Sequence, residues 1–191
     1  MRTSQKLLLT ALAIVFVLPI YKAMSVEPLE QSGLYLGPQI SVYNTPDADN
    51  VSFMGGVALR MKLSQYIGFE GSINYRQEEY SGGSVTARSW PVMITGLVFP
   101  IPIVYGAFGF GWYNTNLSYN NTKLNLSLTS ETQQKIGWHF GGGVEIPVGT
   151  SIKLVGDVRY VFLNYDFKEY PGSDHLKANF YVLTVGFMFK L

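Results

Sequence analysis

The chain has 191 residues, a formal net charge of +1 and no cysteine, and it is 47% hydrophobic but only 14% charged. Average soluble domains carry about 25% charged residues, so this chain is poor in surface charge. Its 12 Phe, 13 Tyr and 3 Trp exclude a disordered chain, and its near-neutral balance gives no basic surface for nucleic acid. The lack of cysteine excludes a disulfide framework, a thiolate metal site, a cysteine nucleophile and a lipidated cysteine anchor.

Residues 1–25 have the layout of a secretory signal peptide. A basic start is followed by an apolar run from Leu7 to Leu18, and residues 23–25 (Ala-Met-Ser) supply the small side chains of a cleavage site. The apolar run is shorter than the roughly 20 residues that span a bilayer, which disfavours a transmembrane anchor. We therefore expect residues 1–25 to be removed and residues 26–191 to form one exported domain.

The remaining sequence predicts eight β-strands, because apolar and polar residues alternate with a period of two. The expected strands are 33–43, 51–62, 66–76, 88–98, 104–114, 135–146, 151–163 and 179–191. The long polar connections are 44–50, 77–87, 115–134 and 164–178, and short turns alternate with them. This alternation predicts an up-and-down meander with two different ends. Pro38 and Pro91 fall inside strands, where we expect bulges or slightly different strand limits.

The polar face of these strands combines glycines with charges of both signs, as expected for a barrel interior. An eight-stranded barrel is just wide enough for side chains to fill it, so long charged groups inside need small residues opposite them. On the apolar face, aromatic residues lie near strand ends, as in the aromatic girdles of membrane barrels. Because hydrocarbon tolerates no unpaired strand edge, such strands must close on themselves. We predict an all-β, eight-stranded antiparallel up-and-down transmembrane β-barrel; the alternative is a soluble lipocalin-type barrel with its apolar residues inside.

Three groups of residues are candidates for a site. The predicted polar network of the barrel interior comprises Arg60, Glu70, Arg76, His139, Glu145, Lys153, Asp157 and Arg159. The predicted lipid-interface aromatics are Trp90, Trp112, Trp138, Tyr160 and Tyr181. The candidate interaction residues of a loop are Leu124, Leu126 and Leu128. Their even-numbered positions continue the apolar alternation of Ile136 and Trp138. We therefore expect this strand to continue beyond the membrane, as a hairpin with residues 114–119.

The charges on the polar face are placed to meet one another. Around the turn at residues 147–150, a simple hairpin register puts Glu145 opposite Lys153 and His139 opposite Arg159. Around the turn at residues 63–65, Arg60 lies diagonal to Glu70. Because buried charges must be paired, we interpret this network as a structural plug, with an ion pathway as the alternative.

Five segments resemble the small outer-membrane β-barrels of the OmpA, OmpX and opacity-adhesin type. They are YIGFEGSINYR (66–76), VYGAFGFGW (104–112), WHFGGGVEIPVG (138–149), KLVGDVRYVFL (153–163) and YVLTVGFMFKL (181–191). The resemblance implies a Gram-negative outer membrane, with outer-membrane lipids and lipopolysaccharide as neighbours. It also implies recognition by the barrel-assembly machinery through the C-terminal strand, where Phe187 and Phe189 match the family and the last residue is Leu191.

We expect a structural or surface-interaction role, in adhesion or membrane integrity, through loops that contact an extracellular or host partner. The alternatives are a small pore or transport protein and a lipid-modifying barrel enzyme. His139 and His175 are the two histidines available for catalysis. His139 has no obvious serine nucleophile on its own face, and His175 lies in a polar loop that does not hold triad geometry without support. We therefore expect no enzyme activity, no cofactor and no metal site, and no nucleic acid as a partner.

Overall fold

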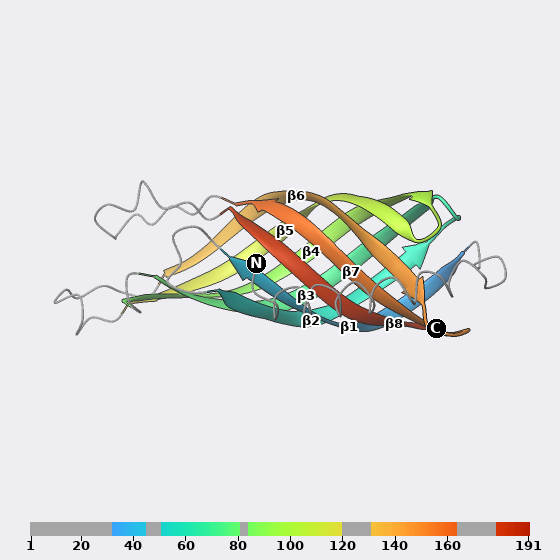
Figure 1. Cartoon of the computed structure of the whole chain (residues 1–191). Helices are drawn as coiled ribbons and strands as arrows, with labels where there is room; N and C mark the ends of the chain where they lie inside the picture. The colour runs from blue at the N-terminus through green and yellow to red at the C-terminus, as the bar shows by residue number, and fades with distance from the viewer. Residues whose placement is uncertain (1–31, 45–50, 81–83, 120–130, 164–178) are drawn as a thin grey trace, which may run out of the picture.

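The computed structural model describes residues 32–44, 51–80, 84–119, 131–163 and 179–191, and these form eight β-strands. The strands are β1 (Gly33–Asn44), β2 (Ser52–Lys62), β3 (Ile67–Tyr80), β4 (Val85–Ile101), β5 (Val104–Tyr119), β6 (Glu131–Pro147), β7 (Ile152–Phe162) and β8 (Phe180–Lys190). Each strand pairs antiparallel with its neighbours in sequence, and β1 pairs with β8, so the sheet closes into a barrel (Figure 1). The predicted fold and strand order are confirmed. Within the described ranges, no helix is both long and apolar enough to cross a membrane.

The two ends of the barrel differ in the length of their strands. At one end, short turns join β2 to β3, β4 to β5 and β6 to β7. At the other end, β3 to β6 project further, with 14, 17, 16 and 17 residues against 11 or 12 in the remaining strands. The predicted limits of these four strands were therefore too short. Most of the residues added to β3, β5 and β6 are polar, so they lack the apolar alternation on which the prediction rested.

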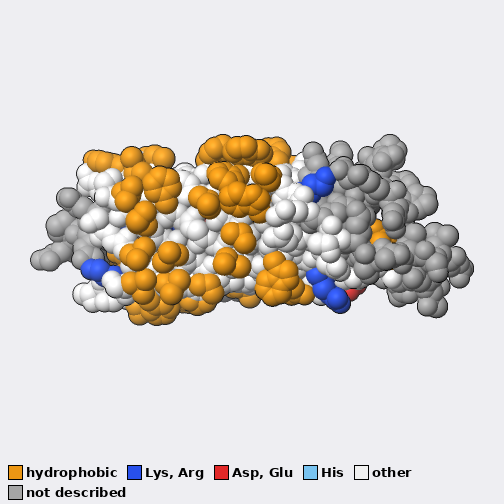
Figure 2. Space-filling model, turned by 180° about the vertical axis from the view of Figure 1, so that it is seen from behind, with side chains coloured by type: hydrophobic (Ala, Val, Ile, Leu, Met, Phe, Trp, Pro, Cys, Tyr) orange, Lys and Arg blue, Asp and Glu red, His pale blue; other side chains and the backbone are white. Residues whose placement is uncertain are grey.

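Side chains on every strand alternate between the lumen and the outer surface. On β8, Leu183 is 52% exposed whereas its neighbour Thr184 is 8% exposed. The same alternation places large apolar residues around the middle of the outer surface, while the charged side chains on the face in Figure 2 lie toward its two ends. This is the inverted arrangement of a membrane barrel. Ile146 is an exception: it belongs to the apolar face of the predicted strand 135–146, but it is 1% exposed at the short-turn end of β6.

The two strand prolines interrupt the ladder without producing a bulge. Between β1 and β8 the pairs stop at Leu36–Phe189 and resume in the same register at Gln39–Gly186, on either side of Pro38. Between β3 and β4 the pairs likewise skip Pro91 and keep their register. The expected bulges are therefore wrong at both positions. Proline removes a backbone donor, so one ladder is locally broken while the pairing on the other side of each strand continues.

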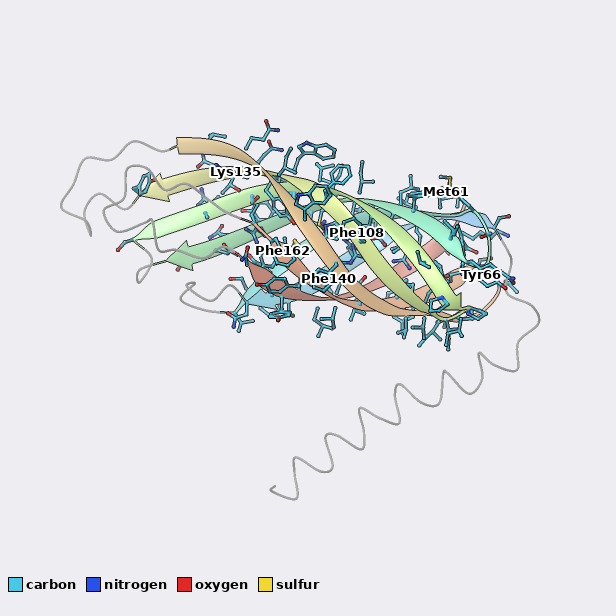
Figure 3. All side chains as sticks on the ribbon, turned by 90° about the horizontal axis from the view of Figure 1, so that it is seen from above. Met61, Tyr66, Phe108, Lys135, Phe140 and Phe162 are labelled. Carbon is cyan, nitrogen blue, oxygen red and sulfur yellow. The ribbon has the colours of Figure 1, made fainter. Side chains whose placement is uncertain are left out.

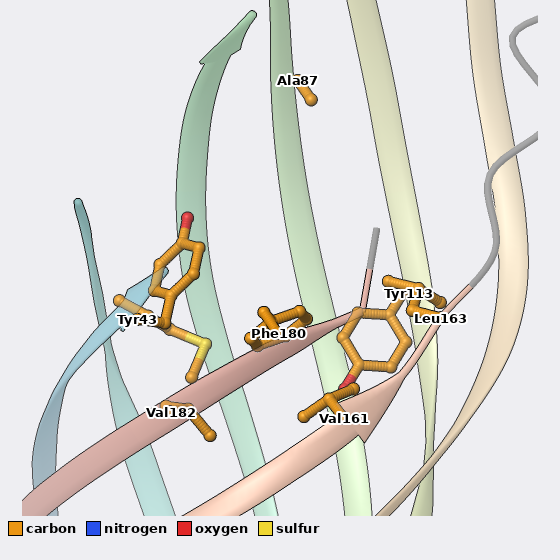
Figure 4. Packing of buried hydrophobic residues seen from close by; sticks show 8 residues of the cluster. Tyr43, Ala87, Tyr113, Val161, Leu163, Phe180 and Val182 are labelled. Atoms are coloured by element: carbon orange, nitrogen blue, oxygen red, sulfur yellow. The ribbon is translucent and has the colours of Figure 1, made fainter. Parts of the chain in front are cut away.

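The lumen is filled by apolar clusters on both sides of a charged centre. Toward the short-turn end the cluster contains Tyr35, Ala58, Leu97, Phe99, Tyr105, Ala107, Val155 and Met188. Toward the other end it contains Tyr43, Met54, Ala87, Tyr113, Val161, Leu163, Phe180 and Val182, most of which are seen inside the ring of strands in Figure 4. A cavity of about 10 Å³ beside Met54, Met93 and Phe180 has room for about one water molecule.

Candidate functional site

Arg60 is the centre of a buried network that crosses the lumen from β2. Its Nη1 donates a hydrogen bond to Oε2 of Glu145 at 2.9 Å, and its Nε donates to Oε2 of Glu70 at 3.1 Å. Arg60, Glu70 and Glu145 are each at most 3% exposed. One guanidinium group therefore joins β2, β3 and β6 across the inside of the barrel.

Arg159 of β7 connects the network to the opposite wall of the barrel. Its Nη2 donates to Oε1 of Glu70 and to Oδ2 of Asp157, both at 2.8 Å. The hydroxyl of Tyr105 donates to the same Asp157 oxygen at 2.9 Å and accepts a hydrogen bond from Nη2 of Arg60 at 3.2 Å. Glu70 thus lies between two guanidinium groups, and Tyr105 links β5 to the network.

Two lysines reach the same oxygen of Glu145 from different strands. Nζ of Lys153 lies 2.7 Å from Oε1, and Nζ of Lys62 lies 3.2 Å from it. Each ammonium group also lies over an aromatic ring: Lys153 is 3.9 Å from the ring centroid of Tyr35, and Lys62 is 4.0 Å from that of Phe99. These cation–π contacts stabilise positive charge where carboxylates are outnumbered.

The network comes close to neutrality within the barrel. Its members are four cations (Arg60, Lys62, Lys153, Arg159) and three anions (Glu70, Glu145, Asp157), each in at least one ion pair. Removing charges from water costs several kcal/mol per ion, so such a set is stable only when its members are paired and hydrogen bonded. The seven charged residues join four strands across the lumen, and Tyr105 adds β5 as a fifth.

Arg76 and His139 were predicted to belong to the same network, but the structure places them at its margins. Arg76 lies toward the long-connection end, 3.2 Å from Glu78, and its guanidinium carbon is 4.4 Å from the ring centroid of Phe180. His139 is fully buried, with Nε2 2.9 Å from Oγ1 of Thr95. Arg159 also donates to Thr95, at 3.2 Å. Thr95 therefore connects His139 to the network.

The predicted registers of two hairpins need correction. Arg60 lies directly opposite Glu70, not diagonal to it. Glu145 lies opposite Val155 rather than Lys153, and His139 lies opposite Val161 rather than Arg159. The turn after β6 is closed by the N–H of Val148 donating to the carbonyl of Ile152, which shifts the pairing by two residues. Lys153 still reaches Glu145 because its side chain is long.

Three members of the interior network were not among the predicted site residues. Tyr105, Thr95 and Lys62 all take part through their side-chain polar atoms. Each lies at a position whose side chain alternates toward the lumen, and this alternation was the signal in the sequence that could have identified it. Their partners come from distant strands, so sequence spacing gave no sign of the contacts.

The five predicted interface aromatics all lie on the outer surface. Trp90, Trp138 and Tyr181 are more than half exposed, and Trp112 and Tyr160 are partly covered by neighbouring rings. Figure 3 shows Phe108, Phe140 and Phe162 on the same surface. The rings of Tyr160 and Tyr181 are 4.5 Å apart, and those of Tyr75 and Trp90 are 4.6 Å apart. Such rings are typical of the boundary between hydrocarbon and water.

Beyond this aromatic boundary, β3 to β6 form a four-stranded wall, which we call the raised wall. Residues 77–80 of β3 pair with β4, and no described residue pairs with them on the β2 side. Residues 131–137 of β6 pair with β5 up to Leu117, and no described residue pairs with them on the β7 side. The wall confirms that β5 and β6 continue as a paired hairpin past the predicted strand ends, whereas Leu124, Leu126 and Leu128 lie outside the described residues.

The direction of the backbone groups along β6 follows from one hydrogen bond. The N–H of Glu145 donates to the carbonyl of Ile103 at 2.8 Å, on the β5 side. Successive residues of a strand point their backbone groups to alternate sides, so odd-numbered residues of β6 face β5. The even-numbered residues Thr132, Gln134 and Ile136 therefore direct their N–H and C=O groups to the β7 side, where no described residue pairs with them.

The described residues offer little for catalysis or metal binding. None of the described His, Asp and Glu side chains gather in a group of three that could hold a metal ion. His139 has no access to solvent, and His175 lies outside the described ranges. The chemistry that the described chain presents is a paired ionic interior and an exposed polar wall with two strand edges.

Comparison with known proteins agrees with this geometry. A family model described as outer membrane protein beta-barrel domain matches residues 10–189. The attachment invasion locus protein Ail of Yersinia pestis superposes with a TM-score of 0.53 at 14% identity, over 85% of this chain and 100% of its own. Ail has also been solved in complex with the heparin analogue sucrose octasulfate.

Two further structures share the fold. Neisserial surface protein A superposes with a TM-score of 0.57 at 15% identity, covering 85% of this chain and 100% of its own. The outer membrane protein OprG of Pseudomonas aeruginosa gives 0.57 at 13% identity, covering 84% of this chain and 97% of its own. No curated protein sequence matches the chain. At these identities the likeness to solved structures extends to the fold.

Proposed function

Since the chain belongs to the family of outer membrane protein β-barrel domains, we propose that it is a closed membrane anchor that binds an extracellular protein through its raised wall. Residues 1–25 serve as its export signal, and the C-terminal strand is recognised by the barrel-assembly machinery. The observation that carries the proposal is the pair of strand edges at the outer end, above a lumen that is filled with side chains.

The filled lumen argues against the alternative of a pore or transporter. The ion pairs of Arg60 and Arg159 join opposite walls, and apolar clusters lie above and below them. Passage of a hydrated solute would require several of these buried pairs to separate, and an unpaired buried charge costs several kcal/mol. A barrel of this kind is suited to anchoring.

The edges of the raised wall, which form no ladder with any described residue on the β2 side or the β7 side, support binding by strand addition. An exposed strand edge presents a row of unpaired backbone donors and acceptors, to which an extended peptide can add. On β6 this edge spans 131–137 and begins directly above the aromatic boundary. Binding of this kind depends on the backbone of the edge, so it tolerates varied partner sequences.

A protein partner fits the raised wall better than a sulfated polysaccharide. Ail is known in complex with a heparin analogue, but the outward face of this wall carries mainly amides and hydroxyls. Among its described residues Arg88 is a cation and Glu79 an anion, so it offers no cluster of positive charge for sulfate groups. Uncharged polar strands are compatible with edge pairing.

The test removes one backbone donor from the edge. Gln134→Pro deletes an N–H that faces the open side and leaves the hydrogen bonds between β5 and β6 in place. Gln134→Val is the matched control, because it changes the side chain and keeps the N–H. Bacteria displaying each variant are incubated with fluorescently labelled serum proteins, and bound label is measured by flow cytometry. We expect the bound label to fall at least about tenfold for Gln134→Pro and to stay near the wild-type level for Gln134→Val. Equal binding by the wild type and both variants contradicts the proposal.

A further inference from the structure

The charged network of the lumen leaves out two neighbouring strands, β1 and β8. Its seven charged members lie on β2, β3, β6 and β7, and the side chains of Thr95 and Tyr105 connect β4 and β5 to it. β1 contains no charged residue, and β8 contains one, Lys190, as its last residue. Side chains inside the lumen therefore join the six strands from β2 to β7 to one another, whereas β1 and β8 depend mainly on their backbone ladders.

Three ladders hold β1 and β8 in the barrel, and one of them is interrupted. The ladder of β1 with β2 runs without a gap over residues 33–43, and the ladder of β8 with β7 does so over residues 180–189. The ladder between β1 and β8 lacks the pairs of Gly37 and Pro38. This junction, which we call the seam, is therefore the weakest of the three in backbone hydrogen bonds.

One hydrogen bond shows what Pro38 removes from the seam. The N–H of Leu191 donates to the carbonyl of Leu34 at 2.9 Å. Even-numbered residues of β1 and odd-numbered residues of β8 therefore direct their backbone groups across the seam. Pro38 lies opposite Phe187 in this register, and it has no N–H to donate. A residue with an N–H at position 38 would add a hydrogen bond to the seam.

The small cavity of the lumen lies against the seam. Four of the residues that line it belong to β1 and β8: Gln39, Phe180, Val182 and Thr184. Beside the cavity, a hydrogen bond of 2.9 Å joins the hydroxyls of Ser41 and Thr184 across the seam. No ion pair between described residues crosses it. The interrupted ladder is therefore not reinforced by charge, and a cavity lies next to it.

Two buried cations contact the seam strands through aromatic rings, one on each side of the gap in the ladder. Toward the outer end, the guanidinium carbon of Arg76 is 5.3 Å from the ring centroid of Tyr43 and 4.4 Å from that of Phe180. Toward the short-turn end, Nζ of Lys153 is 3.9 Å from the ring centroid of Tyr35. These contacts stabilise the two ends of the seam, so its middle is the least supported part.

We propose that the barrel opens at the seam, where β1 and β8 separate from each other while β2 to β7 stay joined by the network. Separation of strands within β2 to β7 leaves buried charges without partners, which is strongly unfavourable. An open seam exposes backbone groups that hydrocarbon cannot hydrogen bond, so the closed barrel prevails in the membrane. The seam therefore sets the rate at which the folded barrel is lost. This property is independent of the protein partner proposed above.

The first test restores the missing donor of the seam. Pro38→Ile supplies an N–H that faces Phe187, and Pro91→Ile is the matched control. The N–H of Phe99 donates to the carbonyl of Tyr66, so the backbone nitrogen of Pro91 lies on the β3 side, at the other gap in a ladder. The folded barrel in lipid vesicles is transferred to heated SDS, and the gel mobility of samples taken over time gives the fraction still folded.

We expect Pro38→Ile to unfold about fivefold more slowly than wild type, since one more backbone hydrogen bond must break before the transition state. Pro91→Ile should unfold within twofold of the wild-type rate, because β3 and β4 separate after that state. Equal slowing by the two variants overturns the proposal.

The second test cross-links the seam, so it does not depend on how position 38 tolerates a new side chain. Ser41→Cys with Thr184→Cys spans the seam, and Ser89→Cys with Thr115→Cys spans β4 and β5 as the control. In each pair the two residues lie directly opposite each other, are buried, and have hydroxyls 2.9 Å apart. The protein has no cysteine of its own, so the introduced pair is the one source of an internal disulfide.

We expect the oxidised seam pair to unfold at least about tenfold more slowly than its reduced form, and the oxidised control pair to unfold within twofold of its reduced form. Equal slowing by the two disulfides overturns the proposal, because it means that the strands separate together. An unchanged unfolding rate for the oxidised seam pair overturns it as well.

Discussion

Nη1 of Arg60 donates a hydrogen bond at 2.9 Å to Oε2 of Glu145, although the two residues are 85 positions apart in the sequence and lie on opposite walls of the barrel. The contact spans the lumen from β2 to β6. Glu70, Asp157 and Arg159 extend it to β3 and β7. Ion pairs therefore connect opposite walls of the barrel through its interior.

Loss of one carboxylate charge should destabilise the whole barrel. Glu70→Gln leaves Arg60 and Arg159 buried without their shared anion, and breaking a buried pair in this way costs about 3–5 kcal/mol. Urea unfolding in lipid vesicles, followed by tryptophan fluorescence, measures the loss. Glu79→Gln makes the same chemical change at an exposed position of the same strand, where we expect at most about 0.5 kcal/mol. Similar values for the two variants would show that the network contributes nothing to stability.

The seam between β1 and β8 should be intolerant of any side chain at Gly37. A Cβ atom there would overlap the backbone carbonyl of Phe187 on the closing strand. We expect Gly37→Ala to cost about 3 kcal/mol or more and to reduce the fraction of folded protein on unheated SDS gels. Gly106→Ala is the control, because a Cβ at that outward position meets no atom within 4 Å. A fully folded Gly37→Ala variant would argue against this close approach of the two strands.

The division between lipid-facing and lumen-facing residues can be tested without any substitution. Lipids with a photoreactive diazirine in the acyl chain are incorporated with the barrel, illuminated, and mapped by mass spectrometry on the peptide of β8. Insertion is expected at Leu183, Val185 and Phe187, which are 42–52% exposed, and not at Thr184 or Met188, which are buried. Modification centred on Thr184 and Met188 would mean that the two faces are exchanged.

The part of the β5–β6 hairpin furthest from the membrane should be dispensable for folding. Replacing residues 117–131 with Asn-Gly joins Asn116 to Thr132, which are already paired, through the two-residue turn that such hairpins favour. We expect the variant to keep its heat-dependent gel shift and to lose less than about 1 kcal/mol of stability. A variant that no longer folds would assign the distal hairpin a structural role.

The membrane-spanning part of the fold is predictable because its environment imposes one rule on every strand. Residues such as Leu183 and Thr184 alternate strictly, since one touches lipid and the next touches the packed lumen. The rule weakens where strands leave the membrane. Residues 77–80 and 131–134 are polar on both faces, so their continuation as strand gives no periodic signal.

The sequence predicts which side chains point into the lumen, but it does not predict which of them contact one another. Parity placed Arg60, Glu145 and Arg159 inside, but their pairing depends on barrel closure, which joins strands distant in sequence. A turn of different length shifts the pairing, as happened for Lys153 and Glu145, where the partner moved by two residues. The hubs Tyr105 and Thr95 were missed because their importance comes from position and not from unusual chemistry.

The central claim is that the lumen is closed and that the protein acts at its outer end. Planar bilayer recordings on the purified, refolded barrel test it most directly. The paired charges around Arg60 and the apolar clusters on either side predict no stable open level of porin size at any applied voltage. Reproducible single-channel steps of that size from folded protein, still present after removal of contaminating porins, would contradict the claim.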